Sequence, residues 1–290
     1  MSTPRNAFAR PASSPAGNET RGDRQAGVAS SSNEAGGESP SIVVVVPTYN
    51  EAGNLERLVP AVLGHGPNYR LVIVDDGSPD GTGRLADLLA TRYTGRIQVI
   101  HRSRKRGIGP AYVAGFAAAL ANGAEIVVQM DADLSHDPAD LPRLVAAAAG
   151  ADLVLGSRYV PGGDTIGWPL PRRLLSKLGG HYARLVLGVP VADLTGGFKV
   201  WRRLLLATLD FDHVRADGYG FQIETTYRAI QQGARLIELP IVFADRIAGA
   251  SKLSRRIVIE AAVIVWRLRL DPRVYPRTTR HREDISPDNQ

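Results

Sequence analysis

The sequence predicts an α/β fold in which helices flank a mainly parallel sheet. Short β-branched runs alternate with stretches whose apolar residues recur at helical spacing, and this alternation continues along the chain from residue 41. The runs are continuously apolar, which is typical of strands covered by helices on both faces. With 290 residues, 44% of them hydrophobic, the chain is long enough to enclose such a core.

The two ends of the chain are predicted to lie outside the folded domain. Residues 1–40 are rich in Ser, Gly, Ala, Asn and Pro and lack apolar periodicity, so we expect a disordered tail. No continuous apolar segment follows the arginines of this tail, so it lacks the pattern of a secretory signal. No linker interrupts residues 41–270, which we expect to form one domain, and residues 271–290 are expected to form a basic tail.

The first half of the chain contains four successive units of strand, loop and helix. In the first, an apolar run ends at Pro47 and is followed by Leu55, Leu58, Val59 and Val62 at helical spacing. The later units are predicted as strand Leu71–Val74 with a helix through Leu85, Leu88 and Leu89, strand Ile97–Ile100 with helix Pro110–Leu120, and strand Ile126–Met130 with a helix near 138–149.

The second half continues the same architecture. The segment "ADLVLGSRY" is predicted to be a strand, and "RLIELPIVF" a late strand. Helices are predicted over residues 171–187, 199–208 and 219–232.

A polar loop follows each of the first four predicted strands. The loops are "PTYNE" (47–51), "DDGSPDG" (75–81), "HRSRKRG" (101–107) and "DADLSHD" (131–137). In open α/β sheets, ligands bind beyond the carboxyl ends of the strands. We therefore expect the four loops to converge on one site.

Asp131 and Asp133 are the candidate metal ligands of that site. They are two residues apart, so in extended geometry both carboxylates point to one side. Mg²⁺ and Mn²⁺ are commonly held by one or two carboxylates together with substrate phosphates and water. Asp137, directly before Pro138, is instead predicted to begin the next helix.

Several other kinds of site are excluded or disfavoured. The chain has no cysteine, so disulfides and thiolate sites are excluded, and the fold suits a reducing cytoplasm. Neither a P-loop nor a strand-linked dinucleotide fingerprint is present, and the six histidines show no zinc-protease pairing.

Basic and apolar residues lie together near the C-terminus. The formal net charge is +6, and arginines crowd residues 255–282. Charge alone is compatible with nucleic acid, anionic lipid headgroups or a solvated tail. The apolar run Ile257–Trp266 is too short to cross a bilayer, but residues 257–270 and 172–187 both have the pattern of interfacial helices, which core helices share.

Eight motifs in order resemble one family. They are "VVVPTYNE", "VIVDDGSPDGT", "RKRGIGPAYVAGF", "QMDADLSHDP", "DLVLGSRYV", "DLTGGFKVW", "GFQIE" and "DRIAGASKLS". Over about residues 41–270 the chain resembles GT-A glycosyltransferases of family 2, specifically the dolichol/polyprenol phosphate mannose synthases. The resemblance implies a single GT-A (Rossmann-like) domain with amphipathic C-terminal interfacial helices.

The resemblance also implies roles for individual residues. The residues implied to line the nucleoside pocket are Pro47, Tyr49, Glu51, Val74 and Asp76. Asp131, Ala132 and Asp133 are implied to meet the ribose, the diphosphate and a Mg²⁺ or Mn²⁺ ion. Ser135 stands where some relatives have a glutamine metal ligand; because serine reaches less far, either direct ligation or a bridging water is compatible.

The cationic residues complete the implied site. Arg158 matches an arginine of the sugar and phosphate region, and Arg246, Ser251 and Lys252 match a mobile loop that closes on the diphosphates. The catalytic set is thus Asp133, Arg158, Arg246 and Lys252. Small residues separate Arg246 from Lys252, and two cations there can neutralise charge on a departing nucleotide diphosphate.

The implied activity is transfer of mannose from GDP-mannose to a polyprenyl phosphate at the cytoplasmic face of a membrane. The expected partners are both substrates, the membrane surface and a possible integral-membrane subunit, with no nucleic acid. Two alternatives remain: a polyprenyl-phosphate glucosyltransferase using UDP-glucose, and a non-catalytic nucleotide-sugar-binding subunit. Nucleic-acid binding through the basic tail is disfavoured because recognised motifs and aromatic stacking residues are missing.

Overall fold

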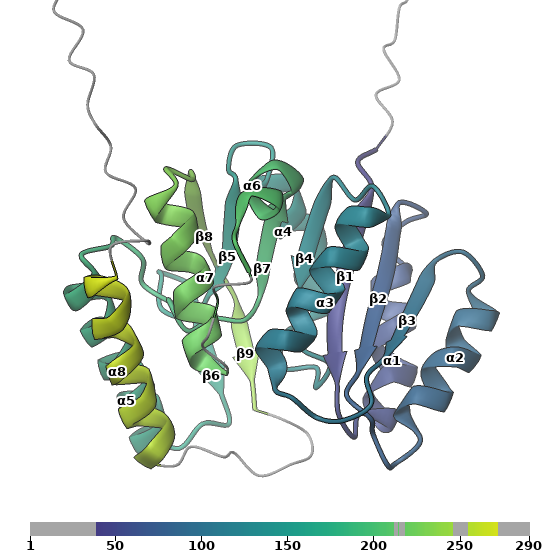
Figure 1. The fold of residues 1–290 in the computed structure, drawn as a ribbon, viewed down its shortest axis with the longest axis horizontal. Helices are drawn as coiled ribbons and strands as arrows, with labels where there is room; N and C mark the ends of the chain where they lie inside the picture. The colour runs from purple at the N-terminus through teal and green to yellow at the C-terminus, as the bar shows by residue number, and fades with distance from the viewer. Residues whose placement is uncertain (1–38, 212–213, 215–217, 246–254, 272–290) are drawn as a thin grey trace, which may run out of the picture. The chain divides into compact units, whose positions relative to one another are not determined.

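A seven-stranded sheet organises residues 39–211, 214, 218–245 and 255–271, the part of the chain that this computed structural model describes (Figure 1). The strand order is β3-β2-β1-β4-β7-β5-β8, and β7 is antiparallel to its neighbours β4 and β5. All other pairs are parallel. The strands are β1 (Ile42–Thr48), β2 (Tyr69–Asp75), β3 (Ile97–His101), β4 (Ile126–Gln129), β5 (Leu153–Ser157), β7 (Lys199–Arg202) and β8 (Leu236–Pro240). The prediction of a mainly parallel sheet is confirmed.

Helices cover both faces of the sheet. One face carries α1 (Ala52–Leu63), α2 (Thr82–Arg92) and α4 (Leu141–Ala147), which follows the short 3-10 turn η1 (Pro138–Asp140). The other face carries α3 (Ile108–Ala121), α6 (Arg203–Thr208) and α7 (Tyr219–Gln231). Beyond α7, α8 (Arg255–Leu270) packs against both α7 and α5 (Leu170–Leu187) (Figure 1).

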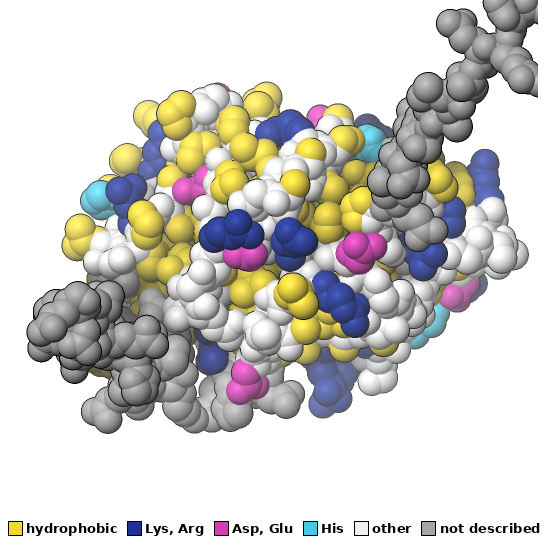
Figure 2. Space-filling view, turned by 90° about the horizontal axis from the view of Figure 1, so that it is seen from above, with side chains coloured by type: hydrophobic (Ala, Val, Ile, Leu, Met, Phe, Trp, Pro, Cys, Tyr) yellow, Lys and Arg dark blue, Asp and Glu magenta, His cyan; other side chains and the backbone are white. Residues whose placement is uncertain are grey.

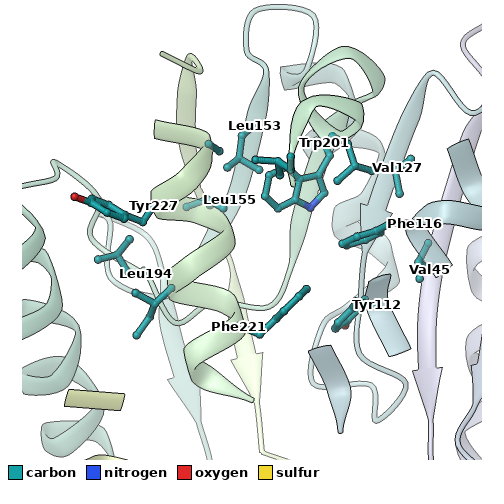
Figure 3. Packing of buried hydrophobic residues seen from close by; sticks show 14 of the residues in the cluster. Val45, Tyr112, Phe116, Val127, Leu153, Leu155, Leu194, Trp201, Phe221 and Tyr227 are labelled. Carbon is teal, nitrogen blue, oxygen red and sulfur yellow. The ribbon is translucent and has the colours of Figure 1, made fainter. Parts of the chain in front are cut away.

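The continuous apolar strands supply both cores at once. In β1, Val43 and Val45 belong to the core under α3 and α7, whereas Val44 and Val46 belong to the core under α1 and α4. This alternation follows from the two-residue period of a strand. Figure 3 shows the first core, in which Trp201 lies between strand residues and the rings contributed by the helices.

Two sequence-based expectations about the second half were wrong in part. Residues 199–208 were expected to form one helix, but Lys199–Arg202 is strand β7 and only Arg203–Thr208 is helical. No Gly or Pro separates the two elements, and pairing with β4 and β5 decides where the strand ends. The expected late strand is divided at Pro240 into β8 and β9 (Val242–Ala244), and β9 pairs with β6 (Asp164–Ile166) in a separate small sheet.

Figure 2 shows the face above the amino ends of the parallel strands. Acidic and basic side chains lie scattered among apolar ones on the part of this face that is visible in Figure 2. The predicted tails, residues 1–40 and 271–290, fall almost wholly outside the described residues. Among the described helices, none is both long and apolar enough to cross a membrane.

Candidate active site

The carboxyl ends of β1, β2 and β4 lie together in the middle of the sheet. β1 pairs with β2 on one side and with β4 on the other, so the direction of chain winding reverses there. A crevice for ligands forms at such a point. The predicted loops 47–51, 75–81 and 131–137 therefore share one rim, and loop 101–107 follows β3 beside β2.

The two neighbouring aspartates after β2 have different surroundings. The Asp75 carboxylate accepts a hydrogen bond from Ser78 Oγ at 2.5 Å and so closes the turn. The Asp76 carboxylate accepts from Arg102 Nη1 at 2.6 Å and from the Arg106 backbone N–H at 3.3 Å. Burial raises the pKa of Asp76, and these donors partly offset that effect. Asp76 is thus the aspartate whose carboxylate contacts the basic loop after β3.

The other residues predicted to line the nucleoside pocket divide between rim and core. Tyr49 is 36% exposed, and Lys105 Nζ lies 3.8 Å from the centroid of its ring. Glu51 is half-buried directly before α1. Pro47 pairs in register with Val74, whose side chain is fully buried. Tyr49 therefore presents a ring at the rim, whereas the side chain of Val74 belongs to the core.

Hydrogen bonds hold both carboxylates of the Asp131–Asp133 segment. Asp131 Oδ1 accepts from the Tyr112 hydroxyl at 2.7 Å, and the Asp131 backbone N–H donates to His136 Nδ1 at 3.1 Å. Asp133 Oδ1 accepts from Ser135 Oγ at 2.5 Å and from the Ser135 N–H at 3.0 Å. Ala132 and Asp133 are buried, so the segment is anchored rather than free in solvent.

Burial determines the protonation states of the two aromatic partners. It raises the pKa of Tyr112 well above the usual value, and the nearby Asp131 charge adds to the effect. The hydroxyl therefore stays protonated and donates. Burial lowers the pKa of His136, and because Nδ1 accepts a hydrogen bond, the neutral ring carries its proton on Nε2.

Asp137 begins a helical turn, as the sequence predicts. Its Oδ1 accepts a hydrogen bond from the Ala139 N–H at 2.9 Å, and Pro138 occupies the first turn of η1. The acidic cluster therefore separates into two carboxylates at the site and one helix cap.

Arg158 lies at the end of β5 and is almost completely buried. Its Nε donates to Asp193 Oδ2 and its Nη2 to Asp193 Oδ1, each at 2.7 Å. Glu238 on β8 accepts from the backbone N–H groups of Ala192 and Asp193 and so holds the loop that carries this carboxylate. In this structure Arg158 therefore belongs to a buried ion pair.

Gly197 leaves room beside Asp131. A Cβ at this position would lie 3.6 Å from Asp131 Oδ2, 3.3 Å from His136 Cε1 and 3.5 Å from Gln222 Nε2. Three polar side chains, two from loop 131–137 and one from α7, thus converge on one point. A Cβ at 197 would be in ordinary contact with the Asp131 carboxylate and in tighter contact with the His136 ring.

Two buried polar residues position Gln222. Its Oε1 accepts from Gln129 Nε2 at 2.6 Å, and its backbone carbonyl accepts from Lys199 Nζ at 2.8 Å. Burial lowers the pKa of Lys199 well below the usual lysine value. These contacts fix the first turn of α7 against β4 and β7.

Arg246, Ser251 and Lys252 lie outside the described residues. Directly before them, β9 ends at Ala244, and Asp245 Oδ1 accepts a hydrogen bond from Arg172 Nη1 at 2.9 Å. Their contact with a diphosphate stays a prediction.

The family is established by comparison with known proteins. Residues 43–209, more than half of the chain, match the family described as "Glycosyl transferase family 2". The chain belongs to glycosyltransferase family 2.

Two relatives of this glycosyltransferase extend over most of its length. It is 46% identical over 246 residues to a polyprenol monophosphomannose synthase of Mycolicibacterium smegmatis, with 81% of this chain and 93% of the relative covered. It is 43% identical over 226 residues to an undecaprenyl-phosphate mannosyltransferase of Micrococcus luteus, with 78% and 93% covered.

A solved structure shows the same fold at lower identity. The glucosyl-3-phosphoglycerate synthase of Mycobacterium tuberculosis, solved with Mn²⁺, UDP and glucosyl-3-phosphoglycerate, superposes with a TM-score of 0.59. The two sequences are 21% identical, and 82% of each chain is covered. The GT-A fold implied by the sequence motifs is confirmed.

Two neighbouring carboxylates of the candidate site have the ligand chemistry that divalent metal ions prefer. Among the described residues, no three Asp, Glu, His or Cys side chains are arranged to hold a metal by themselves. Mg²⁺ and similar ions are commonly bound by one or two carboxylates, with substrate phosphates and waters filling the other positions. Asp131 Oδ2, which lies 3.6 Å from the position that a Cβ on Gly197 would occupy, and the neighbouring Asp133 fit this kind of site.

Several residues of the glycosyltransferase site were missed by the sequence reasoning. Tyr112, His136, Asp193 and Gln222 each contact a predicted site residue or the point beside it. All four stand within or beside quoted motifs, but no pattern assigned them a role. Tyr112 and Asp131 are 19 positions apart, and Arg158 and Asp193 are 35 apart. Such contacts depend on packing and not on local periodicity.

Proposed function

We propose that this glycosyltransferase transfers mannose from GDP-mannose to a polyprenyl phosphate, giving polyprenyl β-mannosyl phosphate and GDP. The observation that carries the proposal is 46% identity over 93% of a polyprenol monophosphomannose synthase. Supporting it, the acids expected for a nucleoside diphosphate site lie on one rim of the sheet. The identity of base and sugar is part of the proposal.

The donor would bind across the carboxyl ends of β1, β2 and β4. Asp76 and Tyr49 would contact the nucleoside, and Asp131 and Asp133 would hold Mg²⁺ or Mn²⁺ together with the diphosphate. When bound, the ion neutralises charge on the departing nucleotide diphosphate. Arg246 and Lys252 would add positive charge as their segment closes.

The acceptor requires no general base. A phosphate monoester loses its second proton near pH 6, so at neutral pH it is already largely a dianionic nucleophile. Its oxygen attacks the anomeric carbon from the side opposite the leaving diphosphate, which inverts the configuration. The task of the protein is to bring two anionic substrates together.

The first turns of α5 would provide cations for the acceptor phosphate, for which Arg172 and Arg173 would exchange the carboxylates of Asp245 and Asp164 that they pair with in this structure. The Arg172 guanidinium lies 4.0 Å from the centroid of the Trp168 ring, and Arg158 lies 5.5 Å from the same ring. Arg173 and Lys177 follow on the same helix. This positive region adjoins the helix face described next, so a phosphate joined to an apolar chain suits it.

The outer face of α5 suits a lipid. Five leucines of this helix are 41% to 77% exposed: Leu170, Leu174, Leu175, Leu178 and Leu185. Trp266 and Leu270 of the neighbouring α8 are also exposed. Apolar residues beside arginines are typical of interfacial helices. We therefore place this face on the cytoplasmic surface of a membrane, alone or with an integral-membrane subunit.

The test is incubation of the purified chain with GDP-[¹⁴C]mannose, Mg²⁺ or Mn²⁺ and a polyprenyl phosphate. We expect label in the lipid fraction, and none when Asn replaces Asp133. Labelling only from UDP-glucose would establish the glucosyltransferase instead. Tight GDP binding without turnover of any donor would identify a non-catalytic subunit.

A further inference from the structure

Among the residues that the structure describes, the Tyr112 hydroxyl is the only side-chain group that donates a hydrogen bond to the Asp131 carboxylate. We propose that Tyr112 is a positioning residue of the transfer site, whose hydroxyl fixes the Asp131 carboxylate so that Oδ2 faces the metal ion and the diphosphate. The inference rests on the proposed function, because it takes Asp131 as a ligand of the ion.

The ring of Tyr112 is held on two sides. It stacks on Phe116 of the same helix, with 5.7 Å between ring centroids, and on Phe221 of α7, with 6.0 Å between centroids and an interplanar angle of 7°. Figure 3 shows these rings between α3 and α7. All three are essentially inaccessible to solvent, so the ring has little freedom to turn away from Asp131.

Close packing of α3 on the sheet fixes the distance between helix and strand. Gly115, three residues after Tyr112, lies so close to β1 that a Cβ there would be 2.2 Å from Val45 Cγ1. The helix can approach the sheet this closely only because the side chain is absent. The approach brings the Tyr112 hydroxyl to the loop that follows β4.

Asp131 is held at both its backbone and its carboxylate. The backbone N–H donates to His136 Nδ1, and Oδ1 accepts from Tyr112. The remaining oxygen, Oδ2, lies 3.6 Å from the position that a Cβ on Gly197 would occupy. The hydroxyl therefore selects which oxygen of the carboxylate is presented to a ligand.

Packing alone does not explain a tyrosine at position 112. The surroundings of the ring are apolar, and phenylalanine would fill the same volume between Phe116 and Phe221. The hydroxyl adds one contact, the 2.7 Å hydrogen bond to Asp131. Partners that orient metal ligands in this way typically contribute about 10–100-fold to metal affinity or activity.

The test is Tyr112→Phe in the full chain, with Mn²⁺ binding followed by electron paramagnetic resonance, first with Mn²⁺ alone and then with GDP. We expect Mn²⁺ affinity to fall about 10–100-fold. The mannosyl transfer rate should recover as Mn²⁺ is raised, because the ligand itself is retained. The matched control is Tyr69→Phe, which removes the hydroxyl of another buried tyrosine at the amino end of β2 and should leave Mn²⁺ affinity unchanged.

The outcomes separate this inference from the proposed function. Equal Mn²⁺ affinity in wild type and Tyr112→Phe would overturn the inference alone. Mn²⁺ binding weakened by Tyr112→Phe, in a protein that makes no mannosyl lipid, would support the inference while overturning the mannosyl transfer. Wild type that binds no Mn²⁺ even with GDP would overturn both.

A second measurement covers a variant too unstable to titrate. With [¹³Cζ]tyrosine incorporated into the wild-type chain, the Tyr112 resonance should shift on addition of Mg²⁺ and GDP, while the Tyr69 resonance should stay unchanged. A Tyr112 resonance unmoved by saturating Mg²⁺ would contradict the proposed contact.

Discussion

The Arg158 guanidinium and the Asp193 carboxylate form a two-pronged ion pair, with Nε–Oδ2 and Nη2–Oδ1 distances of 2.7 Å each. Their side chains are only 4% and 0% exposed. Asp193→Ala would leave a buried cation without its partner, a change that typically costs about 3–5 kcal/mol. We expect a loss of this size in the free energy of unfolding, measured by urea denaturation. A change below about 1 kcal/mol would mean that Arg158 finds another partner.

A surface pair provides the matched control. Arg235 and Asp152 also form a hydrogen-bonded ion pair, but the Arg235 side chain is 65% exposed. Because water screens both charges, Asp152→Ala should barely change the urea midpoint. An equal loss of stability in Asp152→Ala and Asp193→Ala would show that burial does not account for the strength of the Arg158–Asp193 pair.

Asp133→Ala tests the metal site. The substitution removes one of the two carboxylates while leaving the strand β4 and its neighbours in place. Since partners that merely orient ligands contribute about 10–100-fold, loss of a ligand should reduce metal-dependent turnover by at least that factor. Circular dichroism should show an unchanged fold. Unaltered turnover would exclude Asp133 as a ligand.

Gly115→Ala tests the close approach of α3 to the sheet. The added Cβ would meet Val45 Cγ1 at 2.2 Å, so the helix must move outward. Overpacking of this kind typically costs about 1–3 kcal/mol. Because Tyr112 would move with the helix, Mn²⁺ binding should weaken as well.

Gly53→Ala, in α1, is the control for Gly115→Ala, because a Cβ at position 53 would have no close contact. A Cβ at Gly53 finds no atom within 4 Å, so this change should raise the free energy of unfolding by about 0.4–1 kcal/mol. Both variants can be compared in one series of denaturant titrations. A destabilised Gly53→Ala would show that the loss at position 115 is a general effect of replacing glycine in these helices.

Leu174→Ser with Leu178→Ser tests the apolar face of α5. The two side chains are 56% and 57% exposed, so the fold should keep its stability. If the face enters a membrane interface, each serine should weaken binding to anionic vesicles by roughly tenfold. Leu88→Ser, on α2 and 68% exposed, should leave vesicle binding unchanged. Equal sedimentation of all variants with vesicles would place the lipid-binding surface elsewhere.

Lys199→Met tests the buried amine behind Gln222. Burial lowers the folded-state pKa of Lys199 well below its unfolded value of about 10.4. Between those two pKa values the unfolded chain binds more protons, so the stability of the wild type rises with pH in that window. The variant should lack this contribution. The free energy of unfolding of the methionine variant minus that of the wild type should therefore fall as the pH rises toward about 10.4, and a difference that stays constant would show that burial does not lower the Lys199 pKa.

The strand and loop pattern made much of the first half predictable. Residues 126–128 are continuously apolar, and Asp131 and Asp133 follow shortly after them; this order alone indicated a buried strand ending at a site. Residues 199–202 misled the same reasoning. No Gly or Pro separates them from the leucines of α6, and only the position between β4 and β5 makes them a strand.

The acidic residues of the candidate site were predictable from the sequence, but the residues that form hydrogen bonds with them were not. Asp76, Asp131 and Asp133 stand directly after strands, where the chain itself places them at one edge. Tyr112 and His136 carry no pattern that distinguishes them from ordinary core residues. Their roles follow from hydrogen bonds that form only when α3 and the loop after β4 meet.

By itself, then, the sequence determined the α/β class, the loops that meet at the carboxyl edge and the acidic residues within them. These depend on local periodicity and on the alternation of strand and helix, which neighbouring residues encode. Only the tertiary structure decided that Tyr112 orients Asp131, that Asp193 neutralises Arg158 and that the leucines of α5 face outward. Each of these depends on how distant segments pack, because hydrogen bonds and burial require proximity in space and not in sequence.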